Sequence, residues 1–373
     1  MKHFKHLLLL GLLSGAALAA PALKDVALVS PNVAWGSSQA GVYRSTDGGQ
    51  NWHNLTPDLR GDRLQGAFFL DADHAWLTAT APYDAKGQAL RPTRVLRTAD
   101  GGKHWKSVAL FPRGGAGIKF TDARSGTALV ELGAATGHTA FVLLTTRDAG
   151  ATWHKVNSAE YGYMPDPELK GGTLPDVSGP NAFTLLPRFG VLTGIYGPLD
   201  QPYLFITHDG GRSFQEGAGL VPYTPQEKQT AARTNVVWAS GDWARLSSLS
   251  QPAAGASALR IFWTQDAGKT WKGSAALNLP PRSRAAVNFS DWAHGWLWVQ
   301  GSDEQFKALP THLYRTSNGG KDWRDLGAMW QDEDLPTASF FGDQFGLALR
   351  YLGDQPRELW RTADGGQTWQ RLP

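Results

Sequence analysis

One eight-residue motif recurs seven times along the chain and constrains the fold more than any other feature. Each copy has Ser or Thr first, Asp or Asn two positions later, Gly two positions after that, and Trp or Phe at its end. A fixed period of this length indicates a repeat architecture, in which each copy marks one structural unit. The aligned residues, at intervals of 53, 48, 61, 57, 52 and 46, are Asp47, Asp100, Asp148, Asp209, Asp266, Asn318 and Asp364.

The residue types of this motif suit a tight strand–turn–strand junction. The Asp or Asn oxygen can accept hydrogen bonds from backbone N–H groups just downstream, and the Gly takes a backbone conformation that other residues avoid. The Ser or Thr hydroxyl offers a second hydrogen bond, and the aromatic ring packs between neighbouring sheets. We therefore predict a structural role for all seven positions, because a single catalytic or metal site does not use seven residues spread over the whole chain.

Each unit can be divided into four strands. In the second unit, a short turn joins residues 67–70 to 75–79, and residues 93–97 and 105–110 flank the motif as a hairpin. The 43 Gly and 22 Pro supply the many turns that such a fold needs. Four-stranded antiparallel sheets repeated about an axis form a β-propeller. The sequence thus predicts an all-β, seven-bladed propeller with the motif in each third-to-fourth strand hairpin, closed by packing of the first blade on the last without strand exchange.

The N-terminal residues have the pattern of a secretory signal peptide. Lys2 and Lys5 precede an apolar run over residues 7–13, and Ala17-Leu18-Ala19 is a small-x-small cleavage pattern. We predict a signal peptide over residues 1–19 and a single propeller over 20–373, with an uncleaved membrane anchor as the alternative. We expect the mature protein to be periplasmic or secreted and not inserted in a membrane, since no later apolar run is long enough to span one.

Cysteine content and charge exclude several classes of function. The chain has no Cys, which removes disulfides, thiolate catalysis and zinc–thiolate sites. Without Lys2 and Lys5, the 36 Lys and Arg fall to 34 against 33 Asp and Glu, so a general polyelectrolyte mode of nucleic-acid binding is not expected. The His spacing does not indicate a metal site, and the Gly-Gly pairs belong to the motif. We expect no metal, no cofactor and no nucleic-acid partner.

The motif S/T-x-D-x-G-x-T-W resembles the Asp box of bacterial neuraminidase-type (BNR) repeats. These repeats occur in sialidases, two-propeller xyloglucanases, sortilin-type receptors and photosystem II stability/assembly factor-like propellers. Seven boxes with the D-G-G-x-x-W variant are most similar to the last group, whose members are single exported seven-bladed propellers. The resemblance covers the mature chain and implies the fold, but it implies little about function, because propellers host many unrelated activities.

The lengths of the connections indicate which face of the propeller binds a partner. The first-to-second turns are short, whereas the stretches 81–92, 158–181, 217–234, 249–258 and 301–311 are long and fall on the face opposite the boxes. Binding residues concentrate in such loops, although neutral insertions are the alternative. The candidate binding residues there are cations just ahead of first strands and two loop tyrosines, namely Lys24, Arg63, Arg113, Arg233, Arg284, Tyr161 and Tyr163.

These cations would form a positive rim around the central channel. The planar fork of Arg suits an acidic peptide, a C-terminal carboxylate or an anionic glycan. Solvated loop charges are the alternative, and Glu333 and Asp334 break the pattern in the seventh blade. A second series of arginines directly precedes the boxes, and we expect these residues to pack on sheet surfaces and pair with cross-strand acids. They are Arg44, Arg97, Arg315 and Arg361.

Together these features predict a non-catalytic, monomeric scaffold for binding or assembly in the cell envelope. Its expected partner is a segment of an envelope or membrane protein, and an acidic segment or a glycan would suit the rim. The alternative is a sialidase-like glycoside hydrolase or a carbohydrate-binding lectin. The sialidase Arg-Ile-Pro signature is absent near the N-terminus, and Asp84, Asp166 and Glu168 are the carboxylates that could supply the pair that glycoside hydrolysis needs.

Overall fold

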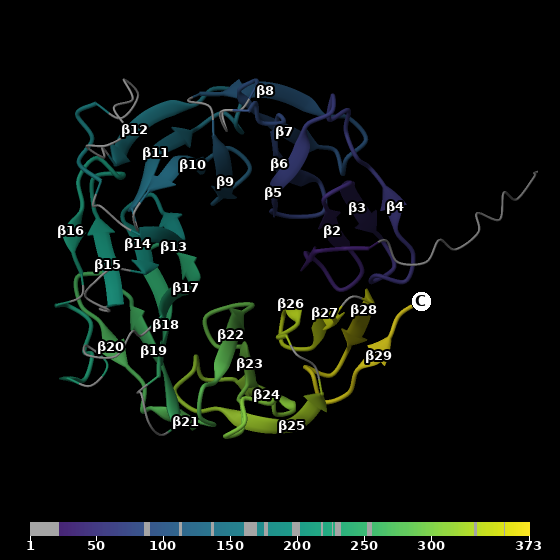
Figure 1. Cartoon of the computed structure of the whole chain (residues 1–373), viewed down its shortest axis with the longest axis vertical. Helices are drawn as coiled ribbons and strands as arrows, with labels where there is room; N and C mark the ends of the chain where they lie inside the picture. Colours follow the sequence, from purple (N-terminus) through teal and green to yellow (C-terminus); the bar gives the residue numbers. More distant parts are fainter. Residues whose placement is uncertain are drawn as a thin grey trace, which may run out of the picture.

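Seven blades surround a central axis in the computed structural model of the protein (Figure 1). The structure describes residues 22–85, 90–111, 114–135, 138–159, 170–174, 178–195, 202–217, 219–225, 227, 233–251, 256–331, 334–353 and 355–373. Each blade is a meander of consecutive antiparallel strands that runs from the centre to the periphery. The predicted seven-bladed, all-β propeller is therefore confirmed. The predicted signal peptide, residues 1–19, lies outside the described residues.

The strand bounds follow the repeat. The first four blades are β1–β4 (Asp25–Leu28, Ala34–Ser38, Gly41–Ser45, His53–Asn54), β5–β8 (Arg63–Phe69, His74–Thr80, Thr93–Ala99, Lys106–Leu110), β9–β12 (Gly115–Phe120, Gly126–Ala135, His138–Thr146, His154–Ala159) and β13–β16 (Ser178–Leu185, Gly190–Ile195, Pro202–Thr207, Gln215–Glu216). The last three are β17–β20 (Arg233–Ser240, Trp243–Ser250, Ser257–Thr264, Lys272–Gly273), β22–β25 (Arg284–Phe289, Gly295–Gln300, Thr311–Thr316, Arg324–Trp330) and β26–β29 (Thr337–Phe341, Phe345–Leu352, Gln355–Thr362, Gln370–Arg371). In the fifth blade, β21 (Leu277–Leu279) also pairs with β19.

The hydrophobic core lies between neighbouring blades. The second strand of each blade is covered on both sides, so β23 is buried at every position of its sequence Gly-Trp-Leu-Trp-Val-Gln. Aromatic side chains bridge the blades: the Trp296 and Phe340 rings stack with centroids 3.9 Å apart, and those of Trp76 and Phe120 with centroids 3.7 Å apart. Burial of these large rings is the main apolar contribution to holding the blades in a ring.

The Asp boxes form seven copies of one hydrogen-bonded turn. In the fifth blade, the Thr264 hydroxyl accepts a bond of 2.9 Å from the Gly268 amide and donates one of 2.8 Å to the Asp266 carboxylate. Asp266 in turn accepts from the Thr270 amide at 2.9 Å. Gly268 has φ +80°, in the left-handed region that favours Gly. The hydroxyl-to-glycine bond is present in all seven boxes.

The boxes share one face of the propeller with the turns between first and second strands. In the second blade, the Gly101 amide donates to the carbonyl of Asp73, and in the sixth the Gly319 amide donates to that of Ala293. Those turns and the boxes therefore form what we call the box face. Because the strands are antiparallel, the second-to-third and fourth-to-first connections lie on the opposite face, called here the loop face.

Hydrogen bonds also tie each blade to the box, or to the adjacent first-to-second turn, of the next blade. Arg97 donates to the carbonyl of Asp148, Arg315 to that of Asp343 and Arg361 to that of Pro31. The arginines that directly precede the boxes are predicted to pack on sheet surfaces and to pair with cross-strand acids. Arg44 and Arg315 do lie over the Trp35 and Trp296 rings, but Arg97, Arg315 and Arg361 bond to backbone carbonyls one blade away, and the carboxylate beside Arg315 is that of Asp343 in the next blade. The other seams are joined by Trp35 to Asp71, Asn157 to Gly211, His208 to Ala267 and Arg245 to Gly319.

The ring closes through apolar packing and hydrogen bonds, without a strand shared between the first and last blades. No strand of β1–β4 pairs with a strand of β26–β29, as predicted. Instead the Leu28 amide donates to the Ser339 hydroxyl at 2.9 Å, and Arg357 donates to the carbonyl of Leu23 at 3.2 Å. Leu23, Val26 and Leu28 pack in one apolar cluster with leucines of the last blade. Among the described residues, no helix is long and apolar enough to cross a membrane.

Candidate functional site

The structure places part of the predicted rim on the loop face. Lys24 directly precedes β1, and Arg63 and Arg284 are the first residues of β5 and β22, the innermost strands of their blades. All three side chains are exposed. Arg233 begins β17 in the same way, but its side chain is not described. Arg113, Tyr161 and Tyr163 lie outside the described residues, so their predicted role stays a prediction.

Arg284 is not a free cation of the rim. Its guanidinium forms an ion pair with Asp334 at 2.8 Å and a hydrogen bond with the Gln300 side chain at 2.5 Å. Asp334 lies just ahead of the first strand of the seventh blade, where the sequence pattern breaks. The ion pair therefore joins the sixth and seventh blades and locally neutralises the rim.

The first, second and seventh blades carry a concentration of positive charge on the loop face. Asp62, whose side chain is fully buried, binds Arg91 at 2.5 Å and Arg94 at 2.8 Å. Burial raises the pKa of the Asp62 carboxyl, but the hydrogen bonds from Arg94 and Arg91 outweigh that effect and hold the pKa below its usual value. Two Arg charges thus face one Asp charge, which leaves one net positive charge beside the start of β5.

On the other side of β1, Arg357 is held beside the residues that lead into that strand. Its guanidinium lies 4.0 Å from the centre of the Tyr351 ring and donates to the carbonyl of Leu23, the residue before Lys24. Stacking of this kind fixes an Arg without neutralising it. The basic sector, as we call this part of the loop face, consists of Lys24, Arg60, Arg63, Arg91, Arg94 and Arg357, with Asp25, Asp58 and Asp62 as its acids.

Six cations stand against three carboxylates in the basic sector, and the exposed Asp84 and Asp334 are further acids on the loop face of the second and seventh blades, which reduces the local excess of positive charge. Among the described residues, the side chains of Lys24 and Arg63 have no hydrogen-bond or ion-pair partner. Arg60 is exposed and lies 3.6 Å from the equally exposed Asp58. Exposed and unpaired cations held on rigid strands are suited to binding an anionic partner.

Asp25 is the acid of the basic sector that belongs to an innermost strand. It begins β1 and its carboxylate accepts a hydrogen bond of 2.9 Å from the Val26 amide. The Asp25 side chain reaches solvent, and crowding by the surrounding protein raises the pKa of its carboxyl, against the opposing effects of that hydrogen bond and of the Arg357 charge. A carboxyl with a raised pKa is the type of group that can act as a general acid.

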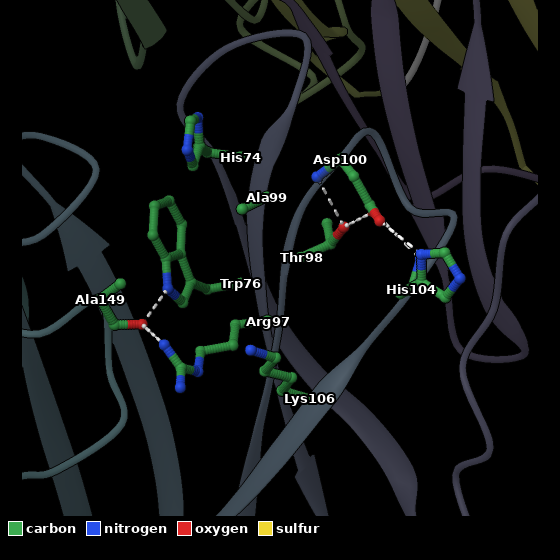
Figure 2. A pocket seen from close by; sticks show the side chains of 9 residues that line it. All are labelled: His74, Trp76, Arg97, Thr98, Ala99, Asp100, His104, Lys106 and Ala149. Atoms are coloured by element: carbon green, nitrogen blue, oxygen red, sulfur yellow. Dashed lines mark hydrogen bonds and ion pairs between the residues drawn. The ribbon is translucent and has the colours of Figure 1, made fainter.

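Besides a cavity of about 510 Å³ lined by Gln50, Arg361 and Arg371 among others, the box face contributes two further cavities that the sequence does not indicate. One, of about 430 Å³, lies where the innermost strands of the second to fifth blades end and is lined by Phe68, Lys119, Thr184 and Trp238 among others. The Lys119 side chain reaches solvent there, and burial by the channel walls lowers the pKa of its amine. The other, of about 260 Å³, lies at the seam between the second and third blades (Figure 2).

The structure describes only one of the three carboxylates proposed for a catalytic pair, so that pair stays a prediction. Asp84 is exposed in the connection after β6, and Asp166 and Glu168 lie outside the described residues. Within the described ranges, no three His, Asp or Glu side chains gather in a group that could hold a metal ion.

Comparisons with known proteins agree with this architecture. The BNR/Asp-box repeat family matches residues 43–54. These residues cover most of β3, the first Asp box and β4. No curated protein matches the sequence at a significant level.

Solved propellers share the fold at low identity. The chain is similar to the GH74 xyloglucanase from Xanthomonas campestris, with 17% identity and a TM-score of 0.58 over 94% of this chain and 54% of that one. It is also similar to a PL25 ulvan lyase, with 11% identity and a TM-score of 0.52 over 94% of both chains. Prolyl oligopeptidase B from Galerina marginata gives 11% identity and a TM-score of 0.57, over 94% of this chain and 50% of that one.

The chain thus spans about half the length of the xyloglucanase and of the prolyl oligopeptidase. The activities of these proteins differ from one another, and at such identities the likeness concerns the propeller fold alone. What this chain does has to be argued from its own side chains.

Proposed function

We propose that the protein is an exported, non-catalytic scaffold that binds an acidic segment of an envelope protein through the basic sector of its loop face. The observation that carries the proposal is that Lys24 and Arg63 are exposed and have no hydrogen-bond or ion-pair partner among the described residues, in a sector where Arg91 and Arg94 share the single carboxylate of Asp62. Arg guanidinium groups match carboxylates in a planar, two-bonded geometry. An acidic peptide or a C-terminal carboxylate is the partner that such a surface fits best.

The rigidity of the blades supports a role in binding. Arg63 begins β5, and Lys24 directly precedes β1 with its amide bonded to the carbonyl of Ser37 in β2. A backbone that is already fixed loses little conformational entropy when a partner docks, so the entropic cost of binding is confined to the side chains. The loop face also carries the long connections, where recognition residues concentrate on a fixed scaffold.

A binding measurement with matched charge reversals tests this function. The parent and the double variant Lys24→Glu/Arg63→Glu are titrated with a fluorescent Asp- and Glu-rich peptide over a range of salt concentrations. We expect the double variant to bind at least about tenfold more weakly, because two attractive charges become repulsive. Lys103→Glu, an exposed residue of the second Asp box, is the control on the other face and is expected to bind like the parent.

Equal affinity of the parent and the double variant would remove the basic sector as the binding surface. The same variants, used to capture partners from the host envelope, test whether the physiological partner uses this surface. Export is tested separately by N-terminal sequencing of the protein recovered from the periplasm or medium, where we expect the chain to begin at Ala20. An N-terminus at Met1 would contradict export by cleavage.

A glycan-active hydrolase is the second candidate, and the raised pKa of Asp25 is the observation that favours it. Glycoside hydrolysis needs a protonated carboxyl as the acid and a second carboxylate about 5 to 10 Å away. A panel of fluorogenic glycosides distinguishes the two functions. Turnover by the parent that Asp25→Asn abolishes would establish the hydrolase, whereas the scaffold predicts no turnover by either protein.

A further inference from the structure

The cavity at the seam between the second and third blades is lined by two cationic side chains and two histidines (Figure 2). It lies on the box face, away from the basic sector, and is lined by residues of β6, β7, β8, the second Asp box and Ala149 of the third. His74, Arg97, His104 and Lys106 line it, and Asp100 is the one carboxylate among its lining residues.

Arg97 and Lys106 face each other across neighbouring strands. They are directly opposite in the antiparallel register of β7 and β8, and Figure 2 shows the Lys106 amine directed towards Arg97. Like charges in this position destabilise a sheet unless an opposite charge lies between them. Neither side chain forms an ion pair with any described acid.

The hydrogen bonds of Arg97 leave part of its guanidinium free. Its Nη1 atom donates to the carbonyls of Asp148 and Ala149 at 3.2 and 3.3 Å. The other N–H groups of Arg97 have no partner among the described residues. The Nη1 end of the guanidinium therefore holds Arg97 in place, while its other N–H groups can donate hydrogen bonds to a ligand beside Lys106.

Asp100 is already occupied. Its carboxylate accepts from the His104 amide at 3.0 Å, lies 2.6 Å from the His104 ring and accepts from the Thr98 hydroxyl at 2.8 Å. Figure 2 shows this carboxylate directed towards His104. It serves the Asp-box turn and does not neutralise the Arg97–Lys106 pair.

The seam between the sixth and seventh blades shows how the same cation pair is neutralised within this protein. Arg315 is directly opposite Arg324, in the positions that Arg97 and Lys106 occupy in the second blade. There the next blade supplies Asp343, whose carbonyl accepts from Arg315 at 2.7 Å and whose carboxylate lies 3.5 Å from the same guanidinium.

The residue of the third blade that corresponds to Asp343 is Ala123. The following residue supplies the carbonyl that accepts the box amide in both blades: Gln344 accepts from Gly365, and Arg124 accepts from Ala149. At this position the repeat therefore has a carboxylate at the seam between the sixth and seventh blades and a methyl group at the seam between the second and third. The cavity of Figure 2 is found at the seam that lacks the carboxylate.

We propose that the seam cavity between the second and third blades binds the phosphate or sulfate group of a small ligand, with Arg97 and Lys106 as the counter-charges. The free part of the Arg97 fork and the Lys106 ammonium donate charge-assisted hydrogen bonds to the oxyanion. His74 and His104 also line the cavity, and their Nδ1 atoms are paired with the carboxylates of Asp71 and Asp100. A volume of about 260 Å³ holds such a group with a small substituent and is below the usual size of a drug-like site.

The proposal is tested by titrating the purified full chain with inorganic phosphate and with sulfate, at an ionic strength kept constant with chloride. Binding is followed by calorimetry and by the rise in melting temperature. Lys106→Gln removes one counter-charge, and Ala123→Asp supplies the carboxylate that Asp343 supplies at the other seam. We expect each variant to bind the anion at least about tenfold more weakly than the parent, the effect of losing one charged hydrogen bond.

Two further variants make the outcome specific to this seam. Lys272→Gln alters the matching residue of the fifth blade, which lies opposite Trp263 and no cation, and we expect it to bind like the parent. Asp343→Ala should create a second anion-sensitive seam. The proposal is overturned if phosphate and sulfate stabilise the parent no more than chloride does, or if Lys106→Gln and Ala123→Asp both bind like the parent. The two titrations separate a phosphate-specific site from one that prefers sulfate.

Discussion

The buried hydroxyl of an Asp box should matter more for stability than the carboxylate that gives the box its name. Thr264 is 1% exposed, and its hydroxyl is the hydrogen-bond acceptor of the buried Gly268 amide. Thr264→Val preserves the shape of the side chain but leaves that amide without a partner. A buried donor left unsatisfied costs about 1–3 kcal/mol. Asp266→Ala instead removes the acceptor of the exposed Thr270 amide and hydroxyl, which water can satisfy, and of the Thr264 hydroxyl, which keeps its bond from the Gly268 amide. We expect it to cost about 1 kcal/mol.

Equilibrium unfolding in urea, followed by tryptophan fluorescence, measures this difference. Thr264→Ser is the control because Ser45 makes the same two bonds in the first box, so the loss should be limited to about 0.8 kcal/mol for one methyl group. The melting temperature is a weaker assay, since unfolding entropy grows with chain length and 1 kcal/mol shifts it by only about 1.3 °C in a chain of this size. A larger cost for Asp266→Ala than for Thr264→Val would refute the reasoning.

Two other predictions concern acid and the closing seam. Burial slightly opposes ionisation of Asp209 and Asp266, but hydrogen bonds from Ser213, Thr270 and the box threonines lower both pKa values to about 2. The stability that these two carboxylates contribute is therefore complete above the unfolded-state pKa near 4 and is lost as the pH falls towards 2. The urea concentration at the unfolding midpoint should fall over that pH range. In Asp209→Asn this fall should be smaller, because one of the two carboxylates is absent. Gly48→Ala and Gly210→Ala impose similar backbone strain, because the two glycines have φ +73° and +75°. Of these two variants, only Gly48→Ala places a methyl group against the Arg361 guanidinium. Gly48→Ala should therefore lower the free energy of unfolding by about 1 kcal/mol more than Gly210→Ala in the same urea assay. Equal losses would show that the Arg361 contact contributes nothing to ring closure.

The repeated motif was sufficient to predict the blades because each residue acts within its own turn. The predicted strand at 75–79 matches β6 to within one residue at each end. The predicted strand at 67–70 was too short, since β5 begins at Arg63 and its register shifts between Leu64 and Gly66. A bulge of this kind breaks the alternation of apolar and polar residues by which a strand is recognised in a sequence.

The candidate site could be predicted only in part, because it depends on which blades are neighbours in the ring. Lys24 and Arg63 were identified from their place ahead of first strands. Arg357 is more than 300 positions from Leu23, to which it is bonded, and no local pattern brings the two together. The neutralisation of Arg284 by Asp334 likewise joins residues 50 positions apart. The unmatched cation pair of the second blade becomes visible only when two seams are compared in space.

Because the ring closes without strand exchange, the fold does not require the chain to begin at the first blade. Every sheet is complete within one continuous segment, so a polypeptide that joined the present ends and opened between the second and third blades would interrupt no backbone ladder. Such a circular permutant would move the one unconnected junction from the seam held by Ser339 and Arg357 to another. Comparing the stabilities of such permutants would then rank the seven junctions between blades by how well each keeps the ring closed without a covalent connection.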